Sequence, residues 1–235
     1  NIRLNIYLIL MSAFIILASL ANYIWIKNDN SITGDGSPNH LLFSISFFYN
    51  TQNIIQEKAI PLWKKIIGVV KLLGRPLYGD AYWPNGVNFT ASLCYALLGK
   101  SLFSAKLSLF PYLFILLFST YAIGRLLYSD FMGLLAAFII FAHPVIFTSS
   151  RQFQLDFPLT SMVVLNILFL LKSCEFKDRR YSILLGIALG WAMLIKGQVI
   201  LFIIWPLLLT LYKVFKKSEN KIVRIKQLQN IVIFV

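Results

Sequence analysis

Acidic residues, and charges in general, are scarce in this chain. Asp and Glu together number 9 among 235 residues, and charged residues of both signs make up 13%. Soluble globular proteins carry about 25% charged residues, so the composition excludes an ordinary soluble domain. Hydrophobic residues make up 58% of the chain, and its mean hydropathy is +0.74. The sequence therefore predicts an integral membrane protein.

Cysteines are also few. The chain has two, Cys94 and Cys174, and the topology derived below places them on opposite sides of the membrane. We therefore expect no disulfide bond between them. Neither cysteine has the close Cys or His neighbours that are typical of a metal site.

Long hydrophobic runs account for most of the chain. The first is too long for the core of a secretory signal, which spans roughly 7–15 residues, and it fits a transmembrane helix of about 20 residues. Together the runs predict six transmembrane helices, at about 4–26, 107–124, 131–149, 157–171, 182–195 and 198–212. His143, before Pro144, is expected to mark a kink or a helix end. The chain starts at Asn1 without a methionine and stops inside an apolar run, so we expect 1–235 to be the N-terminal part of one transmembrane domain.

The topology depends on residues 87–103, a short apolar segment interrupted by polar side chains. If this segment does not cross the membrane, Arg125 and the basic loops 172–180 and 213–226 all lie in the cytoplasm, as the positive-inside rule requires. If it does cross, the same loops lie outside. We therefore predict one extracytoplasmic loop over residues 27–106, within which 87–103 forms a juxtamembrane or re-entrant helix.

A further helix is expected in that loop, around residues 60–76. At helical spacing, Lys64, Lys71 and Arg75 fall on one stripe together with a glycine, while Ile, Val and Leu broaden the other side. Two interpretations remain open. The helix lies in the membrane interface with its apolar side among the acyl chains, or it is an ordinary surface helix with a solvated charged face.

The interiors of the predicted transmembrane helices contain no Asp, Glu, Lys or Arg, which argues against a pathway for ions or protons. Charges gather instead at the predicted outer ends of the helices. These are Asp35, Arg75, Asp80, Lys100, Lys106, Arg151, Asp156 and Lys196. Short connections hold Arg151, Asp156 and Lys196, so we expect these groups to face a common site.

Each of these charges also has a purely structural interpretation. Asp35 can favour the start of a helix at Ser37, and Asp156 can cap the helix that follows it. Arg151 can pair with Asp156, and Lys196 can extend to lipid headgroups.

The order of several motifs matches a known group of enzymes. An early acid, in ITGDGSPNHL, follows the first predicted helix, and RPLYGDAYWPNG and GKSLFSAKLSLF precede the second. An S-R-x-x-x-x-D-x-P element then runs from Ser150 to Pro158, and a G-x-x-x-G…KG helix from Gly186 to Gly197. With these features the chain resembles the polytopic GT-C glycosyltransferases of the protein O-mannosyltransferase and aminoarabinose-transferase type. The resemblance implies an all-α GT-C helical bundle.

The resemblance also implies a reaction. Such enzymes transfer a sugar, with inversion, from a polyprenyl- or dolichyl-phosphate donor to an acceptor hydroxyl or phosphate at the outer membrane face. It implies that Asp35 is the catalytic base, which takes the proton of the acceptor. Many members have Asp-Glu at this point; this chain has Asp35 followed by glycine, which leaves the role of the second carboxylate either unfilled or moved to Asp80 or Asp156.

Cations are expected to stabilise the departing lipid phosphate. We expect Arg151, Lys196 and Lys106 to bind it, with Lys106 standing where family members often have arginine. Asp156 is expected to hold Arg151 in place. The remaining outer charges predicted to line the substrate site are Arg75 and Asp80.

Two other interpretations remain open: a non-enzymatic flippase or transporter component for lipid-linked sugars, and a ligase or polymerase of lipid-linked glycans. The glycosyltransferase interpretation predicts a lipid-linked sugar donor, a glycan, lipid or protein acceptor, and no nucleic-acid partner. It predicts no cofactor, although a divalent metal ion is not excluded. The location expected is a plasma or inner membrane with the active face outside, or the ER membrane in a eukaryote.

Overall fold

The computed structural model describes residues 2–32, 37–75, 84–217, 227 and 229–231. Within this part of the chain all regular structure is helical, so the predicted all-α bundle is confirmed. Asp35 and Asp80, two of the predicted site residues, lie outside the described residues.

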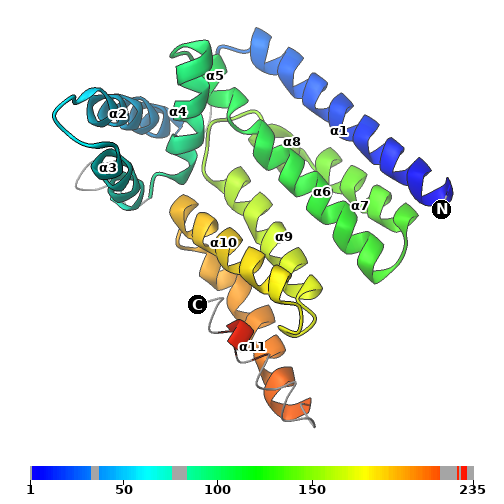
Figure 1. Ribbon diagram of the computed structural model, residues 1–235. Helices are drawn as coiled ribbons and strands as arrows, with labels where there is room; N and C mark the ends of the chain where they lie inside the picture. The colour runs from blue at the N-terminus through cyan, green and yellow to red at the C-terminus, as the bar shows by residue number, and fades with distance from the viewer. Residues whose placement is uncertain (1, 33–36, 76–83, 218–226, 228, 232–235) are drawn as a thin grey trace.

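Eleven helices follow one another in the described ranges. They are α1 (Ile2–Asn28), α2 (Ser37–Gln56), α3 (Leu62–Gly74), α4 (Gly86–Leu98), α5 (Leu102–Leu107), α6 (Phe110–Leu127), α7 (Asp130–Ala142), α8 (Pro144–Ser149), α9 (Asp156–Lys172), α10 (Arg179–Ile195) and α11 (Val199–Lys217). Figure 1 shows α1, α6 and α7 side by side, with α9, α10 and α11 in a second group and α2 and α3 set to one side. Helices α6 and α9 pack together and join the two groups.

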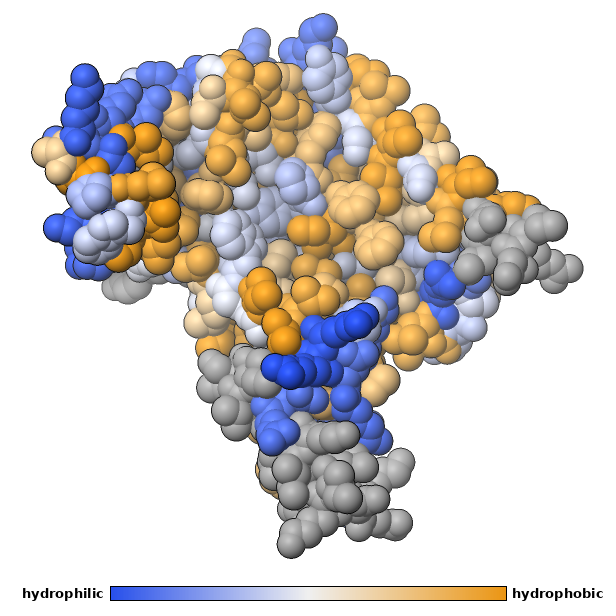
Figure 2. Space-filling model, viewed as in Figure 1, coloured by the Kyte–Doolittle hydropathy of each residue, from blue (hydrophilic) through white to orange (hydrophobic). Residues whose placement is uncertain are grey.

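Three helical stretches of the described chain are long and apolar enough to cross a membrane: Ile6–Asn28, Leu102–Leu127 and Val199–Lys216. Helices α9 and α10 have 17 residues each and α7 has 13. A transmembrane helix needs about 17–25 residues, so α9 and α10 reach the lower limit while α7 alone does not. Hydrophobic side chains cover much of the outer surface of these helices (Figure 2), as lipid contact requires.

One continuous helix was predicted over residues 131–149, and this prediction was wrong because the structure has two helices there, α7 and α8. Helix α7 ends at Ala142, α8 begins at Pro144, and His143 between them is extended, with φ −64° and ψ 125°. The ring of a proline disfavours helical backbone in the residue before it, so Pro144 ends α7 and serves as the first residue of α8. The kink expected at His143 is confirmed.

Helices α6 and α7 form a close hairpin that depends on two glycines. A Cβ atom at Gly133 would lie 2.4 Å from the Tyr121 carbonyl oxygen, and one at Gly124 would lie 2.7 Å from the Gly133 Cα. The turn is further tied by Asp130, which pairs with Arg125 Nε at 2.9 Å and accepts a hydrogen bond of 3.0 Å from the Tyr121 hydroxyl. Only glycine allows backbones to approach this closely.

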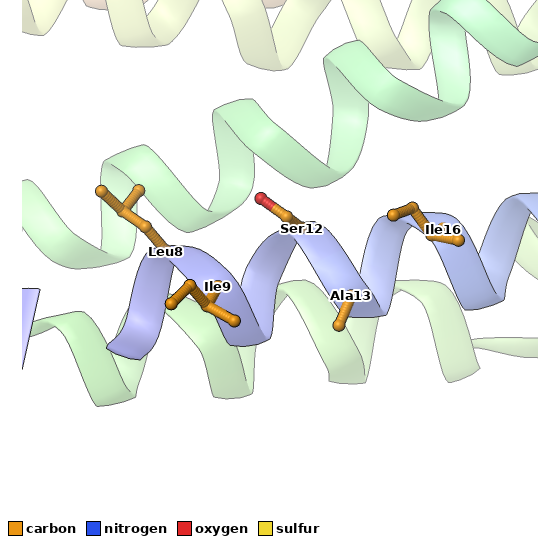
Figure 3. Close-up of a pocket in the computed structure, with 5 residues that line it drawn as sticks. All are labelled: Leu8, Ile9, Ser12, Ala13 and Ile16. Atoms are coloured by element: carbon orange, nitrogen blue, oxygen red, sulfur yellow. The ribbon is translucent and has the colours of Figure 1, made fainter. Parts of the chain in front are cut away.

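Helix α1 has two distinct sides. Its buried side is formed by Met11, Ala18, Asn22 and Ile26, which recur at helical spacing. On its outer side lies a depression of about 510 Å³ lined by Leu8, Ile9, Ser12, Ala13 and Ile16. Figure 3 shows Leu8, Ser12 and Ile16 following one another along the helix. The lining contains no titratable group, so this depression offers no acid–base chemistry.

The predicted outer loop 27–106 is largely helical. The helix expected around 60–76 is present as α3, and the helix start expected at Ser37 is present as the first residue of α2. The segment 87–103 is divided between α4, of 13 residues, and the start of α5. A helix of 13 residues reaches about 20 Å at 1.5 Å per residue, which is too short to cross a hydrocarbon core of about 30 Å.

The predicted topology can be checked by labelling thiols from one side of the membrane. Cys174 is exposed in the turn between α9 and α10, on the predicted cytoplasmic side, and Lys58 is exposed in the turn between α2 and α3. In a Cys94→Ser background, an impermeant reagent added to intact cells should miss Cys174 until the membrane is permeabilised. In a Cys94→Ser/Cys174→Ser background it should label Lys58→Cys at once. The reverse pattern would contradict the topology.

Candidate functional site

Four of the predicted site residues lie at one end of the bundle, where α1 and α10 end and α9 begins. These are Lys106, Arg151, Asp156 and Lys196. Four segments meet there around an enclosed cavity of about 10 Å³, lined by Ser31, Ile32, Leu41, Leu102, Lys106, Gln152 and Phe153. A space of this size accommodates at most about one water molecule. The segment after α1, the start of α2, α5 and the connection before α9 are therefore in direct contact.

Lys106 is buried and bonded to the segment that follows α1. Its Nζ donates to the Asp29 carbonyl oxygen at 3.1 Å, to Asp29 Oδ2 at 3.0 Å and to the Ser31 carbonyl oxygen at 3.0 Å. An ammonium group has three N–H donors, and these three acceptors account for all of them. Lys106 thus fixes residues 29–31 onto α5, and it has no donor left for a phosphate in this arrangement.

Asp29 is the anionic partner in this contact. It accepts hydrogen bonds from the Ser31 hydroxyl at 2.5 Å and from the Ser31 N–H at 3.0 Å. The hydroxyl of Ser31 and the ammonium of Lys106 hold the pKa of Asp29 at about 2, below its ordinary value of 3.8. Because the pKa is lowered in the folded state, this stabilisation is present above about pH 4 and is lost as the pH falls through about 2.

Arg151 is also buried, with 5% of the residue exposed. Its Nε donates a hydrogen bond of 2.7 Å to Asn22 Oδ1 on α1, and Asn22 Nδ2 in turn donates to the Ser150 hydroxyl at 3.0 Å. The guanidinium lies 3.5 Å from the ring centre of Phe147 and 4.8 Å from that of Trp25. Burial lowers the pKa of Arg151 from its ordinary value, although a guanidinium remains charged.

The hydrogen-bonding capacity of Arg151 is only partly used. A guanidinium has five N–H donors, and the residues described in the structure accept from Nε alone. The Nη groups are the ones that bind a carboxylate or phosphate with two parallel bonds. A desolvated cation with donors to spare is suited to an anionic ligand, since electrostatic attraction is stronger away from water.

Asp156 and Lys196 form an ion pair, with 2.7 Å between Oδ1 and Nζ. The expectation that Asp156 holds Arg151 was therefore wrong, because Asp156 contacts Lys196 and Arg151 contacts Asn22. The side chain of Asp156 also does not cap its helix with a hydrogen bond. Asp156 is the first residue of α9, where a negative charge interacts favourably with the helix dipole. The side chain of Asp156 is 69% exposed and that of Lys196 15%, so the carboxylate faces the surface while the lysine is largely buried.

His40, on the first turn of α2, lies within electrostatic range of that pair. Burial lowers the pKa of His40; Asp156 raises it and Lys196 lowers it further. A neutral imidazole offers one donor and one acceptor at physiological pH.

Arg75 does not belong to this group. It follows α3, its side chain is exposed, and its carbonyl oxygen accepts a hydrogen bond of 2.6 Å from Asn85 Nδ2. Asn85 also donates to the Leu72 carbonyl oxygen at 2.9 Å. The next residue, Gly86, lies so close to α10 that a Cβ there would be 2.7 Å from the Leu194 carbonyl oxygen. These contacts fix both α3 and α4 beside the end of α10.

Four residues of this region were missed from the sequence: Asn22, Asp29, His40 and Asn85. Asn22 carried a usable signal, because a polar amide inside an otherwise apolar run needs a hydrogen-bonding partner. Asp29 lies in a short polar stretch after α1, and nothing in that stretch indicates that a lysine 77 residues away binds it. Nothing in the local sequence around His40 or Asn85 indicated what lies next to them.

No group of three or more His, Cys, Asp or Glu side chains that could hold a metal ion occurs among the described residues. The ionisable side chains described in this region include His40, Arg151, Asp156 and Lys196.

A family model described as dolichyl-phosphate-mannose-protein mannosyltransferase matches residues 83–235. The matched region contains Lys106, Arg151, Asp156 and Lys196; the other predicted site residues, Asp35, Arg75 and Asp80, precede it. The resemblance inferred from the motifs is confirmed by this match. No curated protein and no solved structure matches the chain.

The role of Lys106 in fixing the segment after α1 predicts a loss of stability on its removal. Lys106→Ala leaves the Asp29 carboxylate without its cation and should lower the free energy of unfolding by about 1–3 kcal/mol. Asp29→Asn should cost less, and the double variant should cost less than the sum of the two. Thermal unfolding in detergent measures each effect. Lys100→Ala, at an exposed lysine of the same segment, is the matched control and should change little. A normal melting temperature in Lys106→Ala would contradict the assignment.

Proposed function

The chain belongs to the dolichyl-phosphate-mannose-protein mannosyltransferase family, and we propose that it transfers a sugar, with inversion, from a polyprenyl-phosphate donor to an acceptor at the outer membrane face. Family membership makes it a membrane glycosyltransferase with a lipid-phosphate sugar donor. The inverting mechanism, the outer face and the residue roles given below are parts of the proposal.

The observation that carries the proposal is the buried guanidinium of Arg151. A sugar linked to a lipid phosphate leaves a phosphate with growing negative charge when the sugar is transferred, and fixed cations stabilise that charge in the transition state. Arg151 is held in place by Asn22 and by two aromatic rings, and its Nη donors are available to the phosphate oxygens. In this proposal Arg151 takes the main role in phosphate binding, and Lys106 maintains the fold beside it.

Lys196 is assigned a second contact with the donor. It is the residue directly after α10, and Asp156 holds its ammonium at 2.7 Å. The Asp156 carboxylate is 69% exposed, so an anionic group of the donor can approach the ion pair from the solvent side. His40, which is within electrostatic range of this pair, is proposed to bind a hydroxyl of the sugar.

The lipid tail of the donor needs an apolar surface beside these charges. A groove of about 420 Å³ lies between α10 and α11, and its lining is entirely apolar. The lining residues are Gly186, Leu189, Gly190, Met193, Ile200, Ile203, Ile204 and Leu207. Because Gly186 and Gly190 have no side chains, they leave room along α10, and the groove supports the assignment of a polyprenyl chain to this face.

Asp35 is proposed as the base. It lies outside the described residues, but Ile32, three positions earlier, lines the same small cavity as Lys106, and α2 begins two positions later. In the reaction the acceptor oxygen attacks the anomeric carbon from the face opposite the donor phosphate. Its proton passes to the carboxylate, and the bond from the anomeric carbon to the phosphate oxygen breaks. Arg151 and Lys196 then compensate the charge on the departing lipid phosphate.

The proposal is tested by transfer from a panel of radiolabelled polyprenyl-phosphate sugars by the intact protein in membranes. Release of labelled product from one donor supports it, and the same assay identifies the sugar. Translocation of the donor across the membrane without any transfer would contradict it and favour the flippase interpretation.

The assignment of Asp35 predicts a loss of turnover that depends on basicity. Asp35→Asn keeps the size of the side chain and removes the base, so turnover should fall by roughly 100-fold or more while binding of polyprenyl phosphate stays near its normal value. The matched control is Asp178→Asn. Asp178 caps α10 by accepting from the Arg180 and Tyr181 N–H groups, and Asn caps nearly as well as Asp, so this variant should remain active. Full activity in Asp35→Asn would show that Asp35 is not the base.

A further inference from the structure

Helix α3 exposes an apolar surface that none of the described helices covers. Leu62, Trp63, Ile66, Ile67 and Val70 are 73%, 58%, 57%, 44% and 60% exposed. We call this set the α3 apolar strip. None of the residues of α3 is buried. Five large hydrophobic side chains side by side on one short helix form a contiguous patch of a kind that usually contacts a partner or a membrane.

The strip is separate from the side of α3 that packs against α2. With 3.6 residues per turn, the half-buried residues Val69 and Leu72 share one side of α3 with Gly68. A Cβ atom added at Gly68 would lie 3.2 Å from the Ile54 side chain on α2. On the same side, Lys65 Nζ donates to the Ile55 carbonyl oxygen at 2.5 Å. The strip occupies the neighbouring sector of the helix, so α2 holds α3 without covering it.

Cations border the strip on its other edge. Lys64 and Lys71 are seven residues apart and fall on the same line of the helix, between Ile67 of the strip and Gly68 of the α2 side. Helix α3 carries three lysines and no acidic residue. Both Lys64 and Lys71 are exposed, and the Lys64 ammonium lies 5.3 Å from the centre of the Trp63 ring. An apolar sector bordered by lysines and a tryptophan is the arrangement of a helix at a membrane surface.

The direction of α3 agrees with such a position. In Figure 1, α2 and α3 are seen nearly end-on whereas α1 and α6 are seen from the side, so α3 runs across the direction of the long apolar helices. In Figure 2, hydrophobic and hydrophilic surface lie next to each other at the left, where α2 and α3 are located. A helix that crosses the spanning helices at their end lies along the plane of the membrane surface.

We propose that the α3 apolar strip inserts into the boundary between headgroups and acyl chains of an anionic lipid leaflet, with Lys64 and Lys71 on the lipid phosphates. The occupant is the bilayer that the spanning helices of the same chain already occupy. Lysine side chains bury their aliphatic stems and extend the ammonium to the headgroups, and each lysine near an anionic surface adds attraction. This contact goes beyond sugar transfer and does not depend on which residues catalyse it.

Lipid contact at α3 would also restrain the candidate site. Helix α3 is bonded to α2 through Lys65 and to α4 through Asn85, and α2 carries His40, which is within electrostatic range of Asp156 and Lys196. The docked strip therefore fixes the outer side of the helices that border the site.

The test places a fluorescent label on the strip of the intact protein in lipid nanodiscs. Val70→Cys in a Cys94→Ser/Cys174→Ser background is labelled with bimane, and Lys58→Cys, in the exposed turn before α3, is the matched control. With anionic nanodiscs the label at position 70 should have blue-shifted emission, be quenched by brominated lipids and be shielded from aqueous iodide. The label at position 58 should be quenched by iodide. A second label, Ile66→Cys, checks that one substitution has not altered the helix.

The charge component is tested separately. The fraction of inserted label should be higher in anionic than in neutral nanodiscs, and in Lys64→Gln/Lys71→Gln the ratio of inserted to solvated label should fall roughly fivefold per lysine. Equal insertion in both lipids would overturn the role of the lysines. Quenching by iodide at positions 70 and 66 as strong as at 58 would overturn the whole proposal, since it describes a solvated helix. Protection from both quenchers would overturn it in favour of a protein partner.

Discussion

A buried cation must be matched by acceptors, and this requirement organises the end of the bundle where the predicted site residues lie. Lys106 is satisfied by the carboxylate of Asp29 and by two carbonyl oxygens. Arg151 is satisfied in part by Asn22 and by aromatic rings. An unpaired charge at these positions would cost several kcal/mol, so the segment after α1, α5 and the connection before α9 cannot move independently.

The two cations differ in what remains after these contacts are made. All three donors of Lys106 are used within the chain, whereas the described residues use one of the five donors of Arg151. The first group therefore stabilises the fold, and the second is prepared for an anion. In the proposed function, that anion is the phosphate of the lipid-linked donor. This difference between Lys106 and Arg151 depends on which acceptors lie within reach of each side chain in the folded protein.

Much of the fold could be predicted from the sequence because membrane helices satisfy their own backbone and are recognised by apolar length alone. The helix over 4–26 and the break at His143 followed from such local patterns. Helix α2 was not predicted as a full helix, because its 20 residues mix Phe and Ile with Asn, Ser and Gln and have no clear period. Only its start, at Ser37, had a signal.

The grouping of these charges at one end of the bundle was predictable, and their pairing was not. Grouping Arg151, Asp156 and Lys196 at one face followed from their positions at the ends of helices. The partners did not, because Asp156 is closer in sequence to Arg151 but meets Lys196, 40 residues away, while Arg151 meets Asn22, 129 residues away. Helix packing determines which charges meet, and the sequence around each charge does not indicate its partner.

The most direct test of this division of roles is the affinity for polyprenyl phosphate, measured with charge-preserving variants. Arg151→Lys keeps a cation but loses the two parallel Nη donors, and Lys106→Arg keeps a cation at the position that maintains the fold. Both are compared with wild type at a temperature where thermal unfolding shows each to be folded. The structure predicts that Arg151→Lys weakens binding about tenfold or more while Lys106→Arg binds normally. Normal binding by Arg151→Lys, with weakened binding by Lys106→Arg, would contradict the account.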